Sequence, residues 1–430
     1  MSDIHKTIEA VWKIESTRLI AGIARVTGDI GIAEELAQDA LVAALERWPE
    51  EGIPENPAAW LMTAAKRRAI DALRRGRMLE IKHGEIAREL EFQQQRLGDA
   101  MDQALDLVID DDVLRLIFTA CHPVLALEGR VALTLRVACG LTTTEIARAF
   151  LVPEKTLGQR IFRAKKTLSE AHVPFETPRG DELRKRVDSV LSVVYLIFNE
   201  GYTATAGDEW MRAELCHDAL RLGRRLAELL PEESEVHGLL ALMELQASRT
   251  AARRGPAGEA VLLPEQDRSL WDHAQIQRGM TALNRAQQLG GGAHPYALQA
   301  AIAACHARAN TAADTDWERV VLLYDALLQV SPSPIVTLNR AVAVSMAHGP
   351  AAGLHALDAL AAEPALANYH LLPAVRGDLL IKLERYAEAR EELQRALTMT
   401  DNIREQNLLS KKVQQAIALA DAHPRNAFDR

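Results

Sequence analysis

Apolar residues recur every three, four or seven positions along most of this chain. Ile4, Ile8 and Val11 form one such series, and Leu36 and Ala40 belong to another. This spacing places the apolar side chains on one face of an α-helix, whereas a strand with one buried face would show alternation at every second residue. The pattern therefore predicts an all-α protein.

The first lobe is predicted to consist of several helices within residues 5–78. We expect one helix to end at Trp48-Pro49, because proline lacks the N–H group that continues a helix. Asn56 is a favourable N-cap, and Pro57 after it is well tolerated at the first helical position. The next helix is predicted to run from Pro57 to about residue 75.

A polar stretch then leads into an acidic run, and residues 81–112 are predicted to be a solvated linker. No basic residue interrupts the acidic run, which disfavours a compact contact with DNA. An acidic first turn for the helix that opens near Asp111 is compatible with this interpretation. The carboxylates are those of Asp99, Asp102, Asp106, Asp110, Asp111 and Asp112.

Residues 113–175 are predicted to form a second helical domain. Ile146 is placed to pack one helix against Leu157 and Ile161 of the next, with a short bend at Pro153. This is a helix-turn-helix pattern, whose second helix enters the major groove of DNA; a three-helix packing without DNA is the structural alternative. The expected helices cover residues 113–120, 130–138, 143–151 and 154–170, and Cys139-Gly140 is the expected stop of the second.

The remaining residues, 181–430, read as one helix after another. Pro295, Pro334 and Pro373 are each 39 residues apart, and the segments that follow them are similar in type. A period of this length indicates stacked helix pairs, and two of the segments resemble tetratricopeptide helices. Residues 253–266 contain prolines and glycines and predict a long loop.

Composition supports a helical protein, and the absence of certain sequence motifs argues against several classes of function. The chain has 430 residues, of which 48% are hydrophobic and only 4% aromatic, and its net charge is −9. Four scattered cysteines, no signal-peptide pattern and no membrane-length apolar run predict a cytoplasmic location. The absence of nucleotide-binding loops and hydrolase or metalloprotease motifs predicts no cofactor and no enzymatic activity.

Positive charge is concentrated in two short stretches. The first, residues 66–77, holds six cations and one acid. It predicts a phosphate-facing helix, although a solvated helix end rich in Lys and Arg is an equally simple explanation. The second, residues 155–166, lies on the second helix of the predicted helix-turn-helix, where cations suit DNA.

Three segments together resemble a known family. The sequence AEELAQDAL from Ala33, the sequence AWLMTAAKRRAIDALRR from Ala59 and residues 140–168 resemble, in that order, the core-binding helix, the promoter-melting helix and the region-four helix-turn-helix of extracytoplasmic-function (ECF) sigma factors. The resemblance covers about residues 5–175. Residues 195–202 and 261–271 resemble segments of the sigma-factor subgroup with a tetratricopeptide-like C-terminal extension.

The resemblance implies two small sigma domains, residues 1–80 and 113–175, before the extension. It also implies two partners, the β′ clamp helices of RNA polymerase core and promoter DNA, and no membrane. The residues implied to bind core are Glu34, Glu35, Gln38 and Asp39. Those implied to approach the −10 element are Trp60, Lys66, Arg67, Asp71, Arg74 and Arg75, with Trp60 favoured as a packing anchor. Those implied to line the −35 major groove are Lys155, Thr156, Gln159, Arg160, Arg163 and Lys165.

The extension offers one polar constellation, formed by Asn199, Glu200 and Tyr202 around Gly201. It is a candidate ligand site or internal contact; the simpler interpretation is that Gly201 caps a helix with Tyr202 packed behind it. Three Cys-His dipeptides invite a metal interpretation, but adjacent helical residues diverge by about 100°, so no metal site is predicted.

The sequence therefore predicts a sigma factor that binds RNA polymerase core and recognises −35 and −10 promoter elements. Its helical extension is predicted to regulate it in cis or to bind a protein partner. The alternative is a helix-turn-helix regulator with a tetratricopeptide-like scaffold that binds its operator without polymerase.

Overall fold

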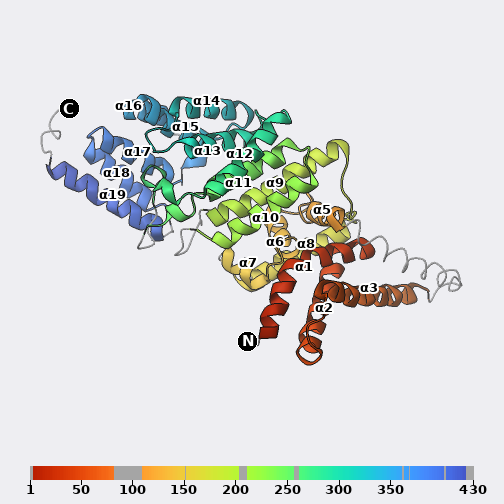
Figure 1. Ribbon diagram of the computed structural model, residues 1–430. Helices are drawn as coiled ribbons and strands as arrows, with labels where there is room; N and C mark the ends of the chain where they lie inside the picture. The colour runs from red at the N-terminus through yellow and green to blue at the C-terminus, as the bar shows by residue number, and fades with distance from the viewer. Residues whose placement is uncertain are drawn as a thin grey trace. The chain divides into compact units, whose positions relative to one another are not determined.

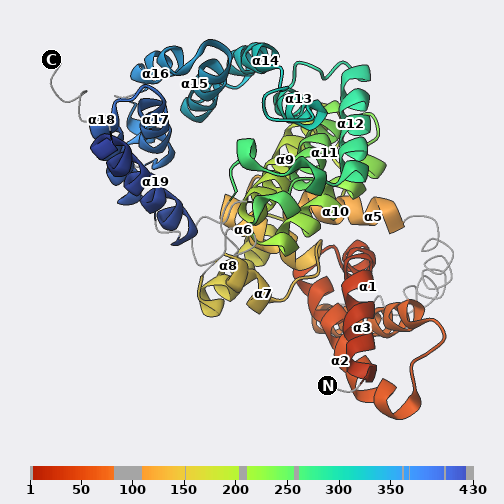
Figure 2. The ribbon, with the colours of Figure 1, turned by 60° about the vertical axis from the view of Figure 1, so that its left-hand side comes forward.

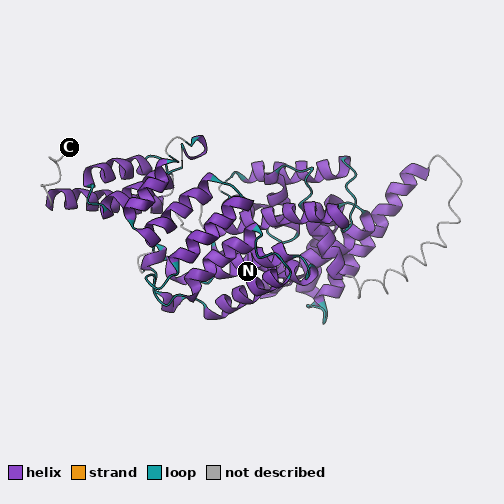
Figure 3. Ribbon diagram, turned by 90° about the horizontal axis from the view of Figure 1, so that it is seen from above, coloured by secondary structure: helices purple, strands orange, loops and turns teal. Residues whose placement is uncertain are grey.

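The computed structural model describes residues 3–81, 109–150, 152–202, 211–255, 261–360, 363–367, 369–400 and 403–422. Every regular element within these ranges is a helix, as Figure 3 shows, and the predicted all-α fold is confirmed. The chain divides into two compact units, residues 1–197 and 198–430.

The first unit contains the predicted sigma domains (Figure 1). Helix α1 packs against α2, α3 and α5, while α8 packs against α6 and α7. The helices are α1 (Asp3–Thr27), α2 (Ile30–Glu51), α3 (Pro57–Ile81), α5 (Ile109–Ala120), α6 (Leu127–Val137), α7 (Thr143–Ala149), α8 (Glu154–Glu170) and α9 (Gly180–Tyr202), the last of which continues past the end of the unit.

Helix α2 does not end at Trp48-Pro49, so that prediction is wrong. Pro49 lies inside the last turn, and the helix ends before Gly52, which has a φ of 88° and donates its N–H to the Trp48 carbonyl. A proline this close to the end removes one hydrogen bond without interrupting a long helix. Glycine then adopts the positive φ that ends it.

The predicted start of α3 is confirmed. The side chain of Asn56 accepts a hydrogen bond from the N–H of Ala59 at 3.0 Å, as an N-cap does. The helix continues to Ile81, beyond the expected end near residue 75.

Most of the predicted linker, residues 82–108, lies outside the described residues, and its last four residues belong to α5. Asp112 is buried, where a solvated linker predicts exposure. Its carboxylate pairs with Arg25 of α1 at 3.4 Å and with Arg115 at 3.0 Å. Two neighbouring arginines therefore compensate the cost of removing this charge from water.

The helix-turn-helix begins with a capping box that was not predicted. Thr142 and Glu145 form a capping box, in which each side chain accepts a hydrogen bond from the other residue's backbone N–H, at 3.1 and 2.7 Å. Helix α8 has the predicted bounds, and α7 ends two residues early, at Ala149. Gly140, with a φ of 72°, follows α6 as expected.

The second unit is a succession of helices, which the reader can follow in chain order by colour and label in Figure 2. Its α-helices after α9 are α10 (Ala213–Leu229), α11 (Ser234–Ala247), α12 (His273–Gln288), α13 (Pro295–Arg308), α14 (Trp317–Val330), α15 (Pro334–His348), α16 (Pro350–Asp358), α17 (Leu371–Lys382), α18 (Tyr386–Leu397) and α19 (Ile403–Ala422). Its short 3-10 helices are η1 (Ala251–Arg253), η2 (Leu263–Glu265), η3 (Arg268–Leu270) and η4 (Pro364–Leu366).

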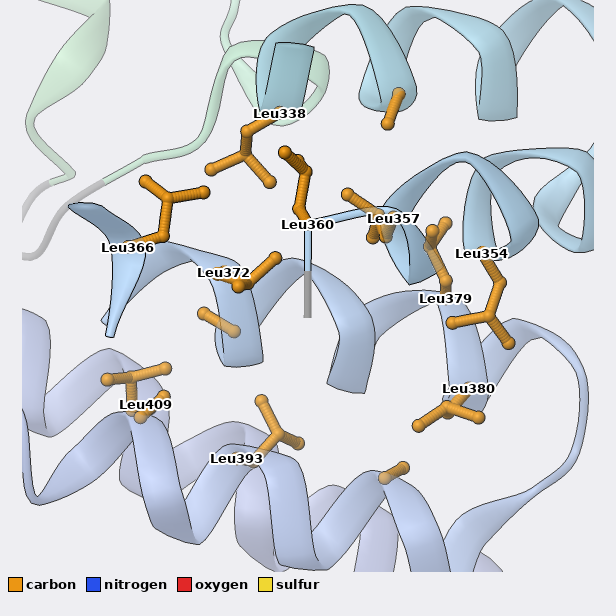
Figure 4. Close-up of a cluster of buried hydrophobic side chains, with 14 of the residues drawn as sticks. Leu338, Leu354, Leu357, Leu360, Leu366, Leu372, Leu379, Leu380, Leu393 and Leu409 are labelled. Atoms are coloured by element: carbon orange, nitrogen blue, oxygen red, sulfur yellow. The ribbon is translucent and has the colours of Figure 1, made fainter. Parts of the chain in front are cut away.

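Consecutive helices of this unit pack against each other, as a helical-repeat pattern predicts. Pro295 and Pro334 begin α13 and α15, whereas Pro373 lies inside the first turn of α17. Helices α15 to α19 share a core made mainly of leucines, among them Leu357 and Leu393, which have no exposed surface (Figure 4).

Candidate nucleic-acid interface

Helix α8 has one buried face and one exposed polar face. Leu157, Ile161, Ala164 and Leu168 are buried at intervals of three and four residues, so they orient the helix against α6 and α7. Four of the residues implied to line the −35 groove are exposed, and Arg160 is half-buried beside them. The exposed ones are Lys155, Thr156, Gln159 and Arg163.

Phe162 belongs to the same exposed face and was not predicted. Its side chain is 67% exposed, an unusual position for an aromatic residue in a small domain. The spacing signal was present, since Phe162 lies three residues after Gln159 and seven after Lys155. An apolar ring there can contact the methyl group of thymine.

Lys165, also implied to bind DNA, is instead paired within the unit. It forms an ion pair with Glu34 of α2, and Glu34 also accepts a hydrogen bond from Arg136 Nε of α6 at 2.6 Å. Glu34 is only 3% exposed, so both cations stabilise a carboxylate removed from water. We call Glu34, Arg136 and Lys165 the Glu34 cluster.

The residues implied to bind polymerase core therefore have different environments. Glu34 is buried in its cluster, and Gln38 donates to it at 2.6 Å. Glu35 and Asp39 are exposed, and so are Ile32 and Val42, at 45% and 51%. The last four residues follow helical spacing, so α2 presents one solvent-facing stripe that mixes acidic and apolar side chains.

On α3, Trp60 packs rather than extends into solvent. Its ring meets the buried Trp48 ring edge to face, with centroids 5.4 Å apart, which favours the packing-anchor interpretation. Lys66 is half-buried, and Arg67 and Asp71 are exposed. The side chains of Arg74 and Arg75 lie outside the described residues.

The two sigma domains contact each other within the first unit. Besides the Glu34 cluster, Arg25 pairs with Asp112, and the Thr17 hydroxyl donates to the Ala138 carbonyl at 3.0 Å. These four polar contacts join α1 and α2 to α5, to α6 and the residue that follows it, and to α8.

The described residues hold no group of three or more His, Cys, Asp or Glu side chains placed to bind a metal ion. The four cysteines are buried and form no disulfide. Burial raises the pKa of the Cys121 and Cys216 thiols to about 12, so neither is a thiolate at neutral pH. None of the helices in the described ranges has the length and apolar content that a bilayer crossing needs.

The polar constellation of the extension is built into the second unit. Glu200 pairs with Arg212, while Tyr202 accepts hydrogen bonds from Arg249 and Arg253 through its hydroxyl and its carbonyl; Asn199 is half-buried nearby. Gly201 is not a cap, because α9 continues to Tyr202. A Cβ there would lie 2.6 Å from the backbone N of Cys216, so α9 and α10 approach too closely for any other residue.

Three protein families match consecutive parts of the chain. Sigma-70 region 2 matches residues 15–78, and Sigma-70, region 4 matches residues 115–168. A family of unknown function, DUF6596, matches residues 186–287.

The curated relatives match either nearly the whole chain or between a third and two fifths of it. An uncharacterized protein of Rhizobium meliloti is 42% identical over 387 residues, which cover 90% of each chain. The probable ECF RNA polymerase sigma factor SigI of Mycobacterium tuberculosis is 26% identical over 173 residues, 39% of this chain and 57% of its own. The ECF RNA polymerase sigma factor SigK of Mycobacterium bovis is 28% identical over 156 residues, 35% of this chain and 78% of its own. The chain therefore belongs to one family with its Rhizobium meliloti relative, and its Sigma-70 region 2 and region 4 matches, together with the ECF sigma factors it resembles, support a sigma factor in transcription initiation.

Proposed function

We propose that the protein is an ECF-type sigma factor that directs RNA polymerase core to specific promoters through −35 and −10 elements. The observation that carries the proposal is the division of α8 into a buried apolar face and an exposed face bearing Lys155, Gln159 and Arg163. A recognition helix needs this division, because its packing fixes the orientation in which the polar side chains meet the groove.

The exposed face of α8 contains the side chains that base recognition requires. Arg163 and the half-buried Arg160 match the O6 and N7 edge of guanine, and Gln159 matches adenine. Lys155 and Thr156 lie at the start of the helix, where contacts with phosphate fix the register. Phe162 adds an apolar contact for a thymine methyl group.

The stripe on α2 is the proposed surface for RNA polymerase core. Glu35 and Asp39 supply negative charge, and Ile32 and Val42 supply exposed apolar area for a helical partner. Basic clamp helices of β′ would complement this combination, because charge steers the encounter and apolar burial stabilises the complex.

The contact between the two sigma domains is proposed to be a resting arrangement. The −10 and −35 elements are about 25 base pairs apart by their names, which is about 85 Å along B-DNA. Domains joined through Glu34 and Lys165 cannot span that distance. We infer that core binding separates them and releases Lys165 for phosphate contact.

The extension is proposed to regulate this opening or to bind a partner protein, and to be tetratricopeptide-like. Its successive packed helices and the roughly regular prolines support this architecture. This part of the proposal is independent of promoter recognition by α8.

Transcription reconstituted with purified core polymerase on a library of randomised promoters tests the proposal. We expect initiation from a subset that shares −35 and −10 words, and footprints on duplex promoter that require core. A footprint that forms equally well without core, together with no retention of core in a pull-down, would favour the operator-binding regulator. A Phe162→Ala variant should lose preference for thymine at one −35 position.

A further inference from the structure

The second unit contains a group of cations that promoter recognition does not use. Arg249, Arg253 and Arg268 surround two aromatic rings, those of Tyr202 and Trp271; we call them the arginine cluster. Arg249 lies between the rings, with its guanidinium carbon 5.9 Å from the Tyr202 centroid and 5.8 Å from that of Trp271. Arg253 lies 3.6 Å from the Tyr202 ring, and Arg268 lies 4.7 Å from the Trp271 ring.

Two of these arginines have no carboxylate partner among the described residues. Arg249 donates to the Tyr202 hydroxyl at 2.8 Å. Arg268 donates to the backbone carbonyls of His306 and Ala309. By contrast, Arg224 and Arg212 of the same unit pair with the carboxylates of Glu244 and Glu200. Arg249 and Arg268 therefore carry positive charge that the described part of the unit does not neutralise by ion pairing.

The cluster also contains donors without acceptors. Arg249 Nε and Trp271 Nε1 are buried and have no hydrogen-bond partner within the described structure, although Trp271 is only 4% exposed. A buried donor without an acceptor destabilises the folded state, so two of them beside three guanidinium groups need an explanation. Both groups are N–H donors, so the partner that each of them lacks is a hydrogen-bond acceptor.

The electrostatics agree with this geometry. Burial lowers the pKa of Arg253, the phenol of Tyr202 raises it, and the charge of Arg249 lowers it further. Burial lowers the pKa of His306 to about 4, and Arg249 and Arg268 contribute to that shift. The neutral His306 adds no charge at pH 7, and the charge of Asp314 raises the pKa of Arg268.

From the guanidinium groups of Arg249 and Arg268, which have no carboxylate partner among the described residues, and from the orphaned donors, we propose that the arginine cluster is a binding site for a small molecule bearing a doubly charged oxyanion, such as a phosphate ester or diphosphate. Phosphate oxygens accept several N–H donors at once, and arginine presents them in a fork that matches this geometry. The burial of Trp271 and of Arg253, which is 6% exposed, favours a small oxyanion over the backbone of a nucleic acid. All five residues lie within the part of the chain that matches the family of unknown function.

The test uses the full-length protein with inorganic phosphate and pyrophosphate as probes. Thermal unfolding and titration calorimetry are run at constant ionic strength, with potassium chloride as the compensating salt. We expect saturable binding and a rise in Tm with either probe. Arg249→Gln and Arg268→Gln should each weaken binding by at least about tenfold, because each removes a charge-assisted hydrogen bond. Arg390→Gln, an exposed arginine of α18, is the matched control and should leave affinity unchanged.

The unliganded variants provide a second measurement. If Arg249 lacks a counter-charge, Arg249→Gln relieves its repulsion with Arg253 and Arg268, and its Tm without phosphate should match that of Tyr202→Phe, which removes only the hydrogen bond to the ring hydroxyl. A Tm several degrees below that of Tyr202→Phe would show that Arg249 is neutralised within the chain and would overturn the proposal. No binding of either probe, or equal binding by the Arg249→Gln and Arg390→Gln variants, would also overturn it. Neither measurement depends on transcription, so the proposed oxyanion site and the proposed promoter recognition can each fail without the other.

Discussion

Arg160 and Lys155 lie on the same helix but are positioned for different tasks. Arg160 flanks the buried face of α8 and is half-buried, so packing restricts its side chain, whereas Lys155 is exposed in the first turn. A restricted guanidinium suits base recognition, because less conformational freedom is lost on binding. A mobile ammonium group suits contact with phosphate.

Arg160→Ala should therefore reduce discrimination between matched and scrambled −35 elements by about 1–3 kcal/mol. Lys155→Ala should weaken binding to all sequences alike and lower the salt slope by about one. Competition binding of the holoenzyme over a salt series measures both quantities. An equal loss on matched and scrambled promoters for Arg160→Ala would contradict its assignment to a base.

His306 makes the stability of the second unit depend on pH. Its ring is 9% exposed and meets the Trp317 ring edge to face, and burial lowers its pKa from 6.5 to about 4. The unfolded chain therefore binds the proton at a higher pH than the folded chain does. The free energy of unfolding should fall as the pH drops from about 6.5 towards about 4, by up to about 3 kcal/mol from this residue.

Denaturant unfolding at pH 7 and pH 4.5, without phosphate, measures this effect against His306→Phe, which keeps an aromatic ring beside Trp317. The wild type should lose more stability than the variant between the two pH values. The same loss in both proteins would show that other groups account for the pH dependence.

At the scale of helices, the Glu34 cluster joins elements whose proposed partners lie far apart on a promoter. Glu34 comes from α2, Arg136 from α6 and Lys165 from α8. Removing one partner of a buried ion pair commonly costs several kcal/mol, because a charge is left partly uncompensated. A substitution at one of these residues should therefore weaken the contact between the two sigma domains.

Arg136→Gln should favour separation of the two sigma domains, since it weakens the contact with Glu34 without altering α8 or the exposed stripe of α2. Energy transfer between dyes at Glu46→Cys on α2 and Lys166→Cys on α8, both exposed positions, should decrease in the variant. Arg67→Gln, on the exposed part of α3, is the control. The resting arrangement would be contradicted if energy transfer in Arg136→Gln equalled that in the wild type and if the wild type kept its full transfer after binding core polymerase.

At the scale of the molecule, α9 crosses the boundary between the two units. The sequence placed the start of the extension at residue 181, but residues 181–197 belong to the first unit. Ser189 is buried there, donates to the Cys121 carbonyl at 2.6 Å and accepts from Arg130 at 2.6 Å. The buried side chains of Val190, Leu191 and Val194 lie on the same part of α9.

A chain that ends after Tyr202 should therefore be stable, and it should show altered promoter-dependent transcription if the extension regulates initiation. A chain that ends after Gly180 should have a lower Tm, because losing several buried apolar side chains costs about 5 kcal/mol or more. Thermal unfolding and transcription with core polymerase measure the two effects. Unchanged transcription and core affinity in the longer variant would exclude regulation in cis.

The sequence alone was sufficient wherever a feature depends on neighbouring residues. The cap at Asn56 and the bounds of α8 follow from hydrogen bonds and packing within a few residues. Helical spacing likewise predicted the buried and exposed faces of α8. The interrupting effect of Pro49 was overestimated, because its cost depends on its distance from the end of the helix.

Only the tertiary structure decided which distant residues meet. Glu34 and Arg136 are 102 residues apart in the chain, and Tyr202 and Arg253 are 51 apart, so no local pattern relates them. The same fold buries Asp112 and brings Arg249 and Arg268 to the Trp271 ring, which they share. Periodicity in the sequence shows which side of a helix is apolar. Which distant residues that side contacts depends on how whole helices pack, and this packing is determined by the sum of many weak contacts.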